Sequence, residues 1–243
     1  MRKKMPKYKL SKKTIVEARK NFSVVYSALE KIYPEAKCAL DHSSSWELLV
    51  ATILSAQCTD VRVNMVTPAL FERYPDVFAI AGADLEELMA LVKSTGFYRN
   101  KAKNIQATAR LIMKNFKGKV PDEMDELLTL PGVARKTANV VLWNAFGKNE
   151  GIVVDTHVGR ISRRLGLTGQ ENPGKVEQNL LKLVPRKNWG QLSHLFIDLG
   201  RDVCKAPTPL CGRCKIREMC PWYDEVVSKQ EIKKKKIPKI HKI

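Results

Sequence analysis

Lys136 and Asp155 are the pair of residues whose types and spacing could perform covalent chemistry. Lys136 follows a Leu-Pro-Gly turn and lies next to Arg135, in the first turn of a helix expected over residues 134–146. A helix N-terminus and a neighbouring cation both favour the neutral form of this amine. A neutral amine can attack a carbonyl-like carbon, and Asp155 would supply a carboxylate nearby. On this segment alone, a solvated surface lysine and an Asp155 that only caps a helix at Thr156 explain the same pattern.

The turn before this helix predicts a phosphate site. Pro131 fixes φ, and Gly132 permits a positive φ that other residues resist. Such a turn can aim backbone N–H groups outward, beside the unpaired N–H groups of the helix's first turn. A grip made of backbone groups binds phosphate without reading the base sequence.

Four cysteines predict a metal centre with four sulfur ligands. Their spacing is C-x6-C-x2-C-x5-C, and they are Cys204, Cys211, Cys214 and Cys220. A zinc ribbon typically has two C-x2-C pairs and this chain has one, so the spacing favours an iron–sulfur cluster but leaves zinc open. The other two cysteines, Cys38 and Cys58, are expected to be small buried apolar residues.

The chain is strongly basic, with 43 Lys and Arg against 25 Asp and Glu, a net charge of +18 over 243 residues. Six of these charges lie in the last twelve residues, which leaves +12 on the rest. A basic body predicts a polyanionic partner, most simply nucleic acid. No secretory signal and no run of 18 apolar residues is visible, so we expect an intracellular protein with reduced thiols and no membrane span.

Apolar residues recur at helical spacing without convincing strand alternation, which predicts an all-α fold of many short helices. Ser44 and Glu47 have the spacing of a capping box, and residues 46–55 are nearly all apolar, which indicates a helix buried on most faces. The expected helices cover residues 12–32, 46–55, 61–74, 85–92, 100–115, 124–129, 134–146, 156–165, 173–183 and 189–203.

Taken together, these residues resemble the endonuclease III family of DNA glycosylases, within the helix-hairpin-helix superfamily. The resemblance spans about residues 20–222 and combines residues 54–57, 130–141 and 154–157 with the cysteine spacing in that order. As a combination, these motifs are far more specific than any one of them. The resemblance implies one [4Fe–4S] cluster on the four cysteines and a nucleophilic role for Lys136.

The resemblance also implies two helical domains with DNA bound at the cleft between them. Residues 38–148 would form a six-helix barrel with the helix-hairpin-helix, and residues 14–37 plus 149–222 would form the iron–sulfur cluster domain. Residues 223–243 are a lysine-rich tail outside the family core, expected to be disordered and to add salt-sensitive DNA affinity. The family implies a monomer in the cytoplasm, associated with the nucleoid and not secreted.

The implied activity is that of a bifunctional DNA glycosylase and AP lyase acting on oxidised or ring-saturated pyrimidines in duplex DNA. Lys136 would attack C1′ of a flipped-out nucleotide, expel the base and cut the strand 3′ to the lesion by β-elimination. Asp155 would stabilise positive charge on the sugar and manage the protons of the amine.

The resemblance assigns DNA contacts to the hairpin and to two wedges. Gln57 would enter the hole left by the flipped base, and Phe97 would be a second wedge where leucine is usual. Ala134 replaces a usual glycine, so it would be strained if the position requires a positive φ. The hairpin residues that would hold backbone phosphate are Leu130, Pro131, Gly132, Val133, Ala134 and Arg135.

Two rival functions use parts of the same pattern. A monofunctional adenine or thymine/uracil mismatch glycosylase would usually have Ser or Tyr in place of Lys136. A non-catalytic DNA-binding or redox-sensing module would need the hairpin and the cluster but not the Lys136 and Asp155 pair. The presence of both residues argues against both rivals, and the preferred lesion is left open.

Overall fold

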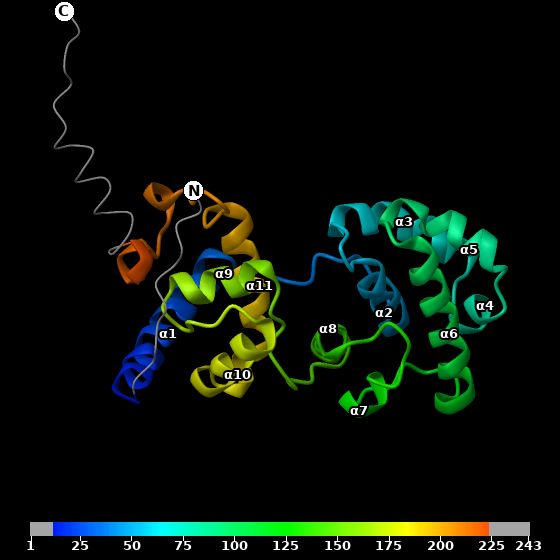
Figure 1. Ribbon diagram of the computed structural model, residues 1–243, viewed down its shortest axis with the longest axis horizontal. Helices are drawn as coiled ribbons and strands as arrows, with labels where there is room; N and C mark the ends of the chain where they lie inside the picture. Colours follow the sequence, from blue (N-terminus) through cyan, green and yellow to red (C-terminus); the bar gives the residue numbers. More distant parts are fainter. Residues whose placement is uncertain (1–11, 224–243) are drawn as a thin grey trace, which may run out of the picture. The chain divides into compact units, whose positions relative to one another are not determined.

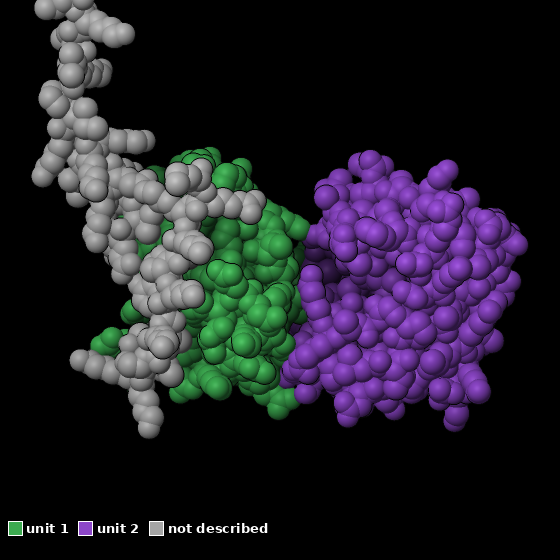
Figure 2. Space-filling model, in the orientation of Figure 1, with its two compact units in different colours: residues 1–37, 151–243 green, residues 38–150 purple. Residues whose placement is uncertain are grey.

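A computed structural model of the chain describes residues 12–223, and within that span every regular element is a helix (Figure 1). The helices fall into two compact units, which Figure 2 colours separately: unit 1 contains residues 1–37 and 151–243, and unit 2 contains residues 38–150. The prediction of an all-α fold is therefore confirmed. Among the helices of the described span, none is long and apolar enough to cross a membrane.

Unit 2 is one continuous segment whose core surrounds α2 (Ser45–Leu54). The Ser44 side chain caps α2 by accepting the N–H of Glu47 at 3.1 Å, as the capping-box spacing predicts. The Glu47 carboxylate, however, accepts from the N–H and hydroxyl of Ser43, at 2.6 and 2.8 Å. Every side chain from Leu48 to Leu54 is buried, because this helix is apolar on all faces. The other helices of unit 2 are α3 (Asp60–Arg73), α4 (Val77–Ala81), α5 (Leu85–Val92), η1 (Lys93–Thr95), α6 (Tyr98–Phe116), α7 (Met124–Leu127) and α8 (Arg135–Phe146).

Unit 1 joins two segments that are far apart in the sequence. Phe22 of the first segment and Phe196 of the second are fully buried in one core. The hydroxyl of Tyr33 donates to Asp202 at 3.0 Å, so side-chain bonds as well as packing hold the segments together. The elements are α1 (Lys12–Ile32), which packs against α10 (Pro173–Leu183) and α11 (Trp189–Asp202), then α9 (Thr156–Arg164), η2 (Arg186–Asn188), η3 (Cys211–Arg213) and η4 (Arg217–Met219).

The predicted helices are correct in type, and their ends agree with the structure to within two residues. The short helix α4 was missed because five residues are too few to show a periodic pattern. The expectation that Cys38 and Cys58 are buried is wrong: both are half-buried and pack against the edge of the unit 2 core. The predicted disordered tail lies outside the described residues, apart from Tyr223.

Candidate functional site

The turn at residues 130–134 leads into α8 of unit 2. Gly132 has a φ of +79°, in the left-handed region that favours glycine. The N–H of Val133 donates to the carbonyl of Leu130 at 3.1 Å, which closes the turn. Both of these apolar side chains are buried, so they anchor the turn in the core while Gly132 stays exposed.

Two side chains of helix α6 contact this turn. The Thr108 hydroxyl donates to the carbonyl of Pro131 at 2.8 Å. Asn104 lies so close to Gly132 that an added Cβ would come within 2.9 Å of its Nδ2, so glycine is required here for space as well as for φ. Ala134 has a φ of −94° and a ψ of 169°, which is extended backbone, so alanine is unstrained in place of the usual glycine.

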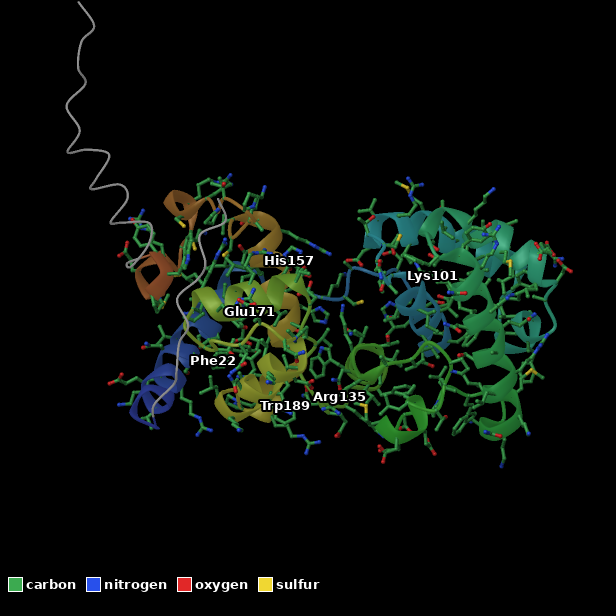
Figure 3. All side chains as sticks on the ribbon, viewed as in Figure 1. Phe22, Lys101, Arg135, His157, Glu171 and Trp189 are labelled. Carbon is green, nitrogen blue, oxygen red and sulfur yellow. The ribbon has the colours of Figure 1, made fainter. Side chains whose placement is uncertain are left out.

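Arg135 and Lys136 occupy the first turn of α8, and both side chains are exposed (Figure 3 labels Arg135). This helix has no acidic residue in its first turn and no side-chain bond at its N-cap. A helix start without a side-chain cap and with two cations beside it suits an anion such as phosphate. Arg135 also donates to the carbonyl of Glu150 at 3.1 Å, which ties the start of α8 to the end of unit 2.

The two predicted wedges share a backbone conformation that the sequence did not reveal. Gln57 has a φ of 55° and Phe97 a φ of 49°, and both are exposed. Among the described residues other than glycine, only Lys117 also has a positive φ. Left-handed backbone costs a residue with a Cβ about 1–2 kcal/mol, so it persists only where the surroundings impose it.

Asp155 is the N-cap of α9 in unit 1. One of its carboxylate oxygens accepts the N–H of Val158 at 2.8 Å, and the side chain is half-buried. The alternative that Asp155 caps a helix is therefore confirmed, and a capped carboxylate is held in one orientation. Lys136 belongs to unit 2 and Asp155 to unit 1, so their pairing stays a prediction.

All four clustered cysteines of unit 1 are half-buried, form no disulfide and line one cavity. Burial raises the pKa of Cys220 to about 11 and also raises the pKa of Cys214. Buried thiols of this kind become thiolates at neutral pH only when a cation offsets the charge. The cavity is also lined by Arg164, Val203, Pro209, Arg217, Trp222 and Tyr223.

Arg164 supplies one such cation to this cavity. Its side chain is buried, and Nη1 donates to the Sγ of Cys204 at 3.1 Å and to the carbonyls of Cys204 and Lys205 at 3.2 and 3.0 Å. The guanidinium lies over the ring of Trp222, 4.7 Å from its centroid. A hydrogen bond from a cation to a thiolate sulfur is the kind of contact that stabilises an iron–sulfur site.

The donor set of the cysteine site fits an iron–sulfur cluster. A four-iron cluster takes one thiolate per iron. Four cysteines that line one cavity of unit 1 supply these four ligands.

Sequence reasoning did not single out Arg164 or Lys101, a buried lysine of unit 2 (Figure 3). Arg164 stands in a helix that also contains Arg160 and Arg163, and nothing in residue type or spacing indicates which of them is buried. Lys101 lies near one end of α6, where the apolar periodicity of the sequence does not show that this lysine is buried. Both positions depend on tertiary packing.

Comparison with known proteins gives a consistent family assignment. Residues 50–186 match the family described as HhH-GPD superfamily base excision DNA repair protein. Endonuclease III of Synechocystis sp. is 58% identical over 193 residues, which cover 79% of this chain and 88% of that protein.

Solved structures agree with the sequence comparison. The chain is similar, with a TM-score of 0.80 and 41% identity, to the protein in "Structure of a non-covalent Endonuclease III-DNA Complex", over 88% of this chain and 98% of that one. It is also similar, with a TM-score of 0.78 and 40% identity, to the protein in "Structure of a Trapped Endonuclease III-DNA Covalent Intermediate: Estranged-Adenine Complex", over 92% of this chain and 100% of that one.

Proposed function

The chain belongs to the endonuclease III family of DNA glycosylases and AP lyases, within the HhH-GPD superfamily of base excision DNA repair proteins, and we propose that Lys136 and Asp155 carry its chemistry. Its substrate is duplex DNA that contains an oxidised or ring-saturated pyrimidine, or an abasic site. The observation that carries the proposal is the exposed lysine in the first turn of α8, directly after the glycine turn. The protein acts as a monomer in the cytoplasm, where it is associated with the nucleoid.

The reaction begins with the damaged nucleotide turned out of the duplex, because its C1′ cannot be reached inside the stack. The Lys136 nitrogen forms a bond to C1′, and the base leaves with the electrons of the glycosidic bond. The sugar ring opens to give an imine, loss of a C2′ proton follows, and the 3′ phosphate leaves. The Asp155 carboxylate stabilises positive charge on the sugar and accepts a proton from the amine.

The turn at residues 130–134 and Arg135 bind the DNA backbone in this proposal. Backbone N–H groups at the start of α8 contact phosphate oxygens, which fixes the position of the DNA without reading its sequence. Gln57 fills the space left by the flipped base, and Phe97 is inserted beside it. An exposed side chain on constrained backbone suits this wedge role, since it needs no rearrangement before it enters the stack.

We further propose that Cys204, Cys211, Cys214 and Cys220 hold one [4Fe–4S] cluster. Their arrangement around one cavity and the Arg164 contact to Cys204 support this assignment. When bound, the cluster supplies cross-links between chain positions 204 and 220, so its role is structural. Unit 1 then corresponds to the cluster domain and unit 2 to the barrel domain.

Borohydride trapping tests the catalytic proposal. Borohydride reduces an imine to a stable amine, so wild-type protein mixed with duplex DNA holding one abasic site should give a covalent adduct on a denaturing gel. Lys136→Gln should abolish the adduct while DNA binding, measured by fluorescence anisotropy, persists. The absence of an adduct from wild-type protein that binds this DNA would refute the lyase assignment and favour a monofunctional glycosylase.

Lys175 offers a matched control for Lys136. It is also an exposed lysine in the first turn of a helix, α10, but it lies in unit 1. Lys175→Gln should leave the adduct at the wild-type level. Equal losses in the two variants would show that the trapped amine is not specific to α8.

A further inference from the structure

Lys101 is a buried lysine that the proposed chemistry does not use. It lies on α6 inside unit 2 with 5% of its surface exposed (Figure 3). Burial lowers the pKa of Lys101, because taking an ammonium out of water disfavours the charged form. A lysine buried at such a cost is retained where its hydrogen bonds hold something in place.

The Lys101 ammonium joins two carbonyls from different parts of the chain. Its Nζ donates to the carbonyl of Leu54 at 2.8 Å and to the carbonyl of Thr95 at 2.7 Å. Leu54 is the last residue of α2, and Thr95 is the last residue of η1. Carbonyls at helix C-termini have no hydrogen-bond donor within the helix and carry partial negative charge. A cation there donates the missing hydrogen bond and offsets the charge.

Each of these carbonyls lies two or three residues before one of the two left-handed residues. Gln57 follows three residues after Leu54, and Phe97 follows two residues after Thr95. The backbone of Lys101 reaches the second loop as well, because its N–H donates to the carbonyl of Phe97 at 3.1 Å. One residue therefore fixes the starting points of both strained loops.

We propose that Lys101 is a positioning residue that holds the Gln57 and Phe97 loops in register so that both side chains enter the duplex together. This inference rests on the proposed function, because it assumes that these two residues are wedges. Left-handed backbone at Gln57 and Phe97 relaxes unless neighbouring contacts prevent it. Loss of the ammonium therefore removes the shared support of both loops and slows the step in which the damaged nucleotide leaves the stack.

Lys101→Met tests this role, since methionine fills similar space without donating a hydrogen bond. We expect single-turnover base removal from a duplex with dihydrouracil opposite adenine to fall by about tenfold or more, as positioning losses can. With dihydrouracil in a mismatch, where the base leaves the stack more easily, the loss should shrink to roughly twofold or threefold. Lys114→Met, an exposed lysine near the other end of α6, should behave as wild type on both duplexes.

A double-variant cycle separates positioning from general loss of structure. If Lys101 acts through the wedges, Lys101→Met should cost little more activity when added to Gln57→Ala and Phe97→Ala together. Equal losses on the paired and mismatched duplexes, or fully additive losses in the cycle, would overturn the inference. Lys101→Gln, which keeps a donor without the charge, replaces the methionine variant if that variant does not fold.

Trapping at a preformed abasic site distinguishes failure of this inference from failure of the proposed function. Lys101→Met should still give the borohydride adduct, because an abasic site has no base that must leave the stack before Lys136 reacts. If wild-type protein gives no adduct, the proposed function fails. If wild-type protein gives the adduct and Lys101→Met removes paired dihydrouracil at the wild-type rate, only the role of Lys101 is wrong.

Discussion

The candidate site of unit 2 depends mainly on backbone conformation, whereas the candidate site of unit 1 depends on side-chain groups. Unit 2 relies on backbone: a glycine with φ of +79°, two exposed residues in left-handed conformation, and a buried ammonium bonded only to carbonyls through Nζ. Unit 1 relies on side chains: four cysteines around one cavity, with the buried guanidinium of Arg164 against Cys204. The turn at residues 130–134 in unit 2 accepts a side chain at Ala134 but needs the backbone freedom of Gly132, whereas the cysteine site of unit 1 depends on its side chains.

Ala134 illustrates the tolerance of the backbone-built site. The family usually has glycine at this position, yet the extended φ of −94° accepts alanine without strain. Gly132, two residues earlier, has no such freedom, because both its φ and the neighbouring Asn104 exclude a Cβ. The comparison therefore predicts which substitutions damage each unit, and the predictions below are arranged from the largest effect to the smallest.

Removal of one cysteine ligand should have the largest effect, and it should be confined to unit 1. We expect Cys220→Ser to abolish the visible absorbance of the proposed cluster and to unfold unit 1. The free energy of a bound structural metal site is comparable to the whole stability of a domain, about 5–15 kcal/mol. Hydrogen exchange followed by mass spectrometry should show lost protection in α9–α11 and retained protection in α2–α8.

Cys38→Ser provides the control for this experiment, since Cys38 is a half-buried cysteine of unit 2 that forms no disulfide. It should leave both the absorbance and the exchange pattern of unit 1 unchanged. Equal loss of protection in the two units of Cys220→Ser would break the comparison, because unit 2 would then depend on the side-chain site of unit 1.

Acid should destabilise unit 1 before unit 2, through His194. Burial lowers the pKa of His194 from its ordinary 6.5 to about 4. As pH falls through about 6.5, the unfolded chain binds this proton while the folded chain does not, so stability falls until about pH 4, by up to about 3 kcal/mol. Asp198 on the same helix acts in the opposite direction, because burial raises the pKa of its carboxyl.

Unit 2 also loses stability on acidification, but in a lower pH window. Salt bridges with Arg73 and Lys148 lower the pKa values of the half-buried Glu87 and Asp122 carboxyls, so their contribution to stability is lost only as pH falls below the ordinary pKa of a carboxyl. Urea unfolding measures the free energy of unfolding at each pH. Between pH 8 and pH 5 this free energy should fall less steeply in His194→Gln than in wild type. At pH 8 and above the difference between the two proteins should be constant. Identical slopes would show that His194 is not the group responsible.

The sequence predicted more of the side-chain site than of the backbone site, for a physical reason. Ligand spacing is a local property, so the four cysteines were identified from the chain alone, and the Pro-Gly pair indicated the turn. The left-handed conformations of Gln57 and Phe97 were not predictable, because neither residue type prefers that region. The family resemblance named these two positions, but the Lys101 contact that accompanies them arises only when α2, η1 and α6 pack together.

A matched pair of glycines gives the test with the smallest expected effect and the closest control. Gly132 and Gly147 both lie in unit 2 with positive φ, +79° and +66°, but an added Cβ would meet Asn104 at the first and nothing within 4 Å at the second. Gly147→Ala should cost about 1–2 kcal/mol of unfolding free energy, the ordinary penalty for left-handed backbone. Gly132→Ala should cost about 1 kcal/mol more, because Asn104 must also move.

The two glycine variants should also differ in DNA binding. Gly132→Ala should weaken binding to a duplex with an abasic-site analogue, since it disturbs the N–H groups at the start of α8. Gly147→Ala should leave binding unchanged, because it alters only the other end of the same helix. Equal losses of unfolding free energy and equal DNA affinities in the two variants would contradict this prediction. They would mean that Asn104 moves at no cost and that Gly132 is no more sensitive to an added Cβ than a glycine at an ordinary helix end.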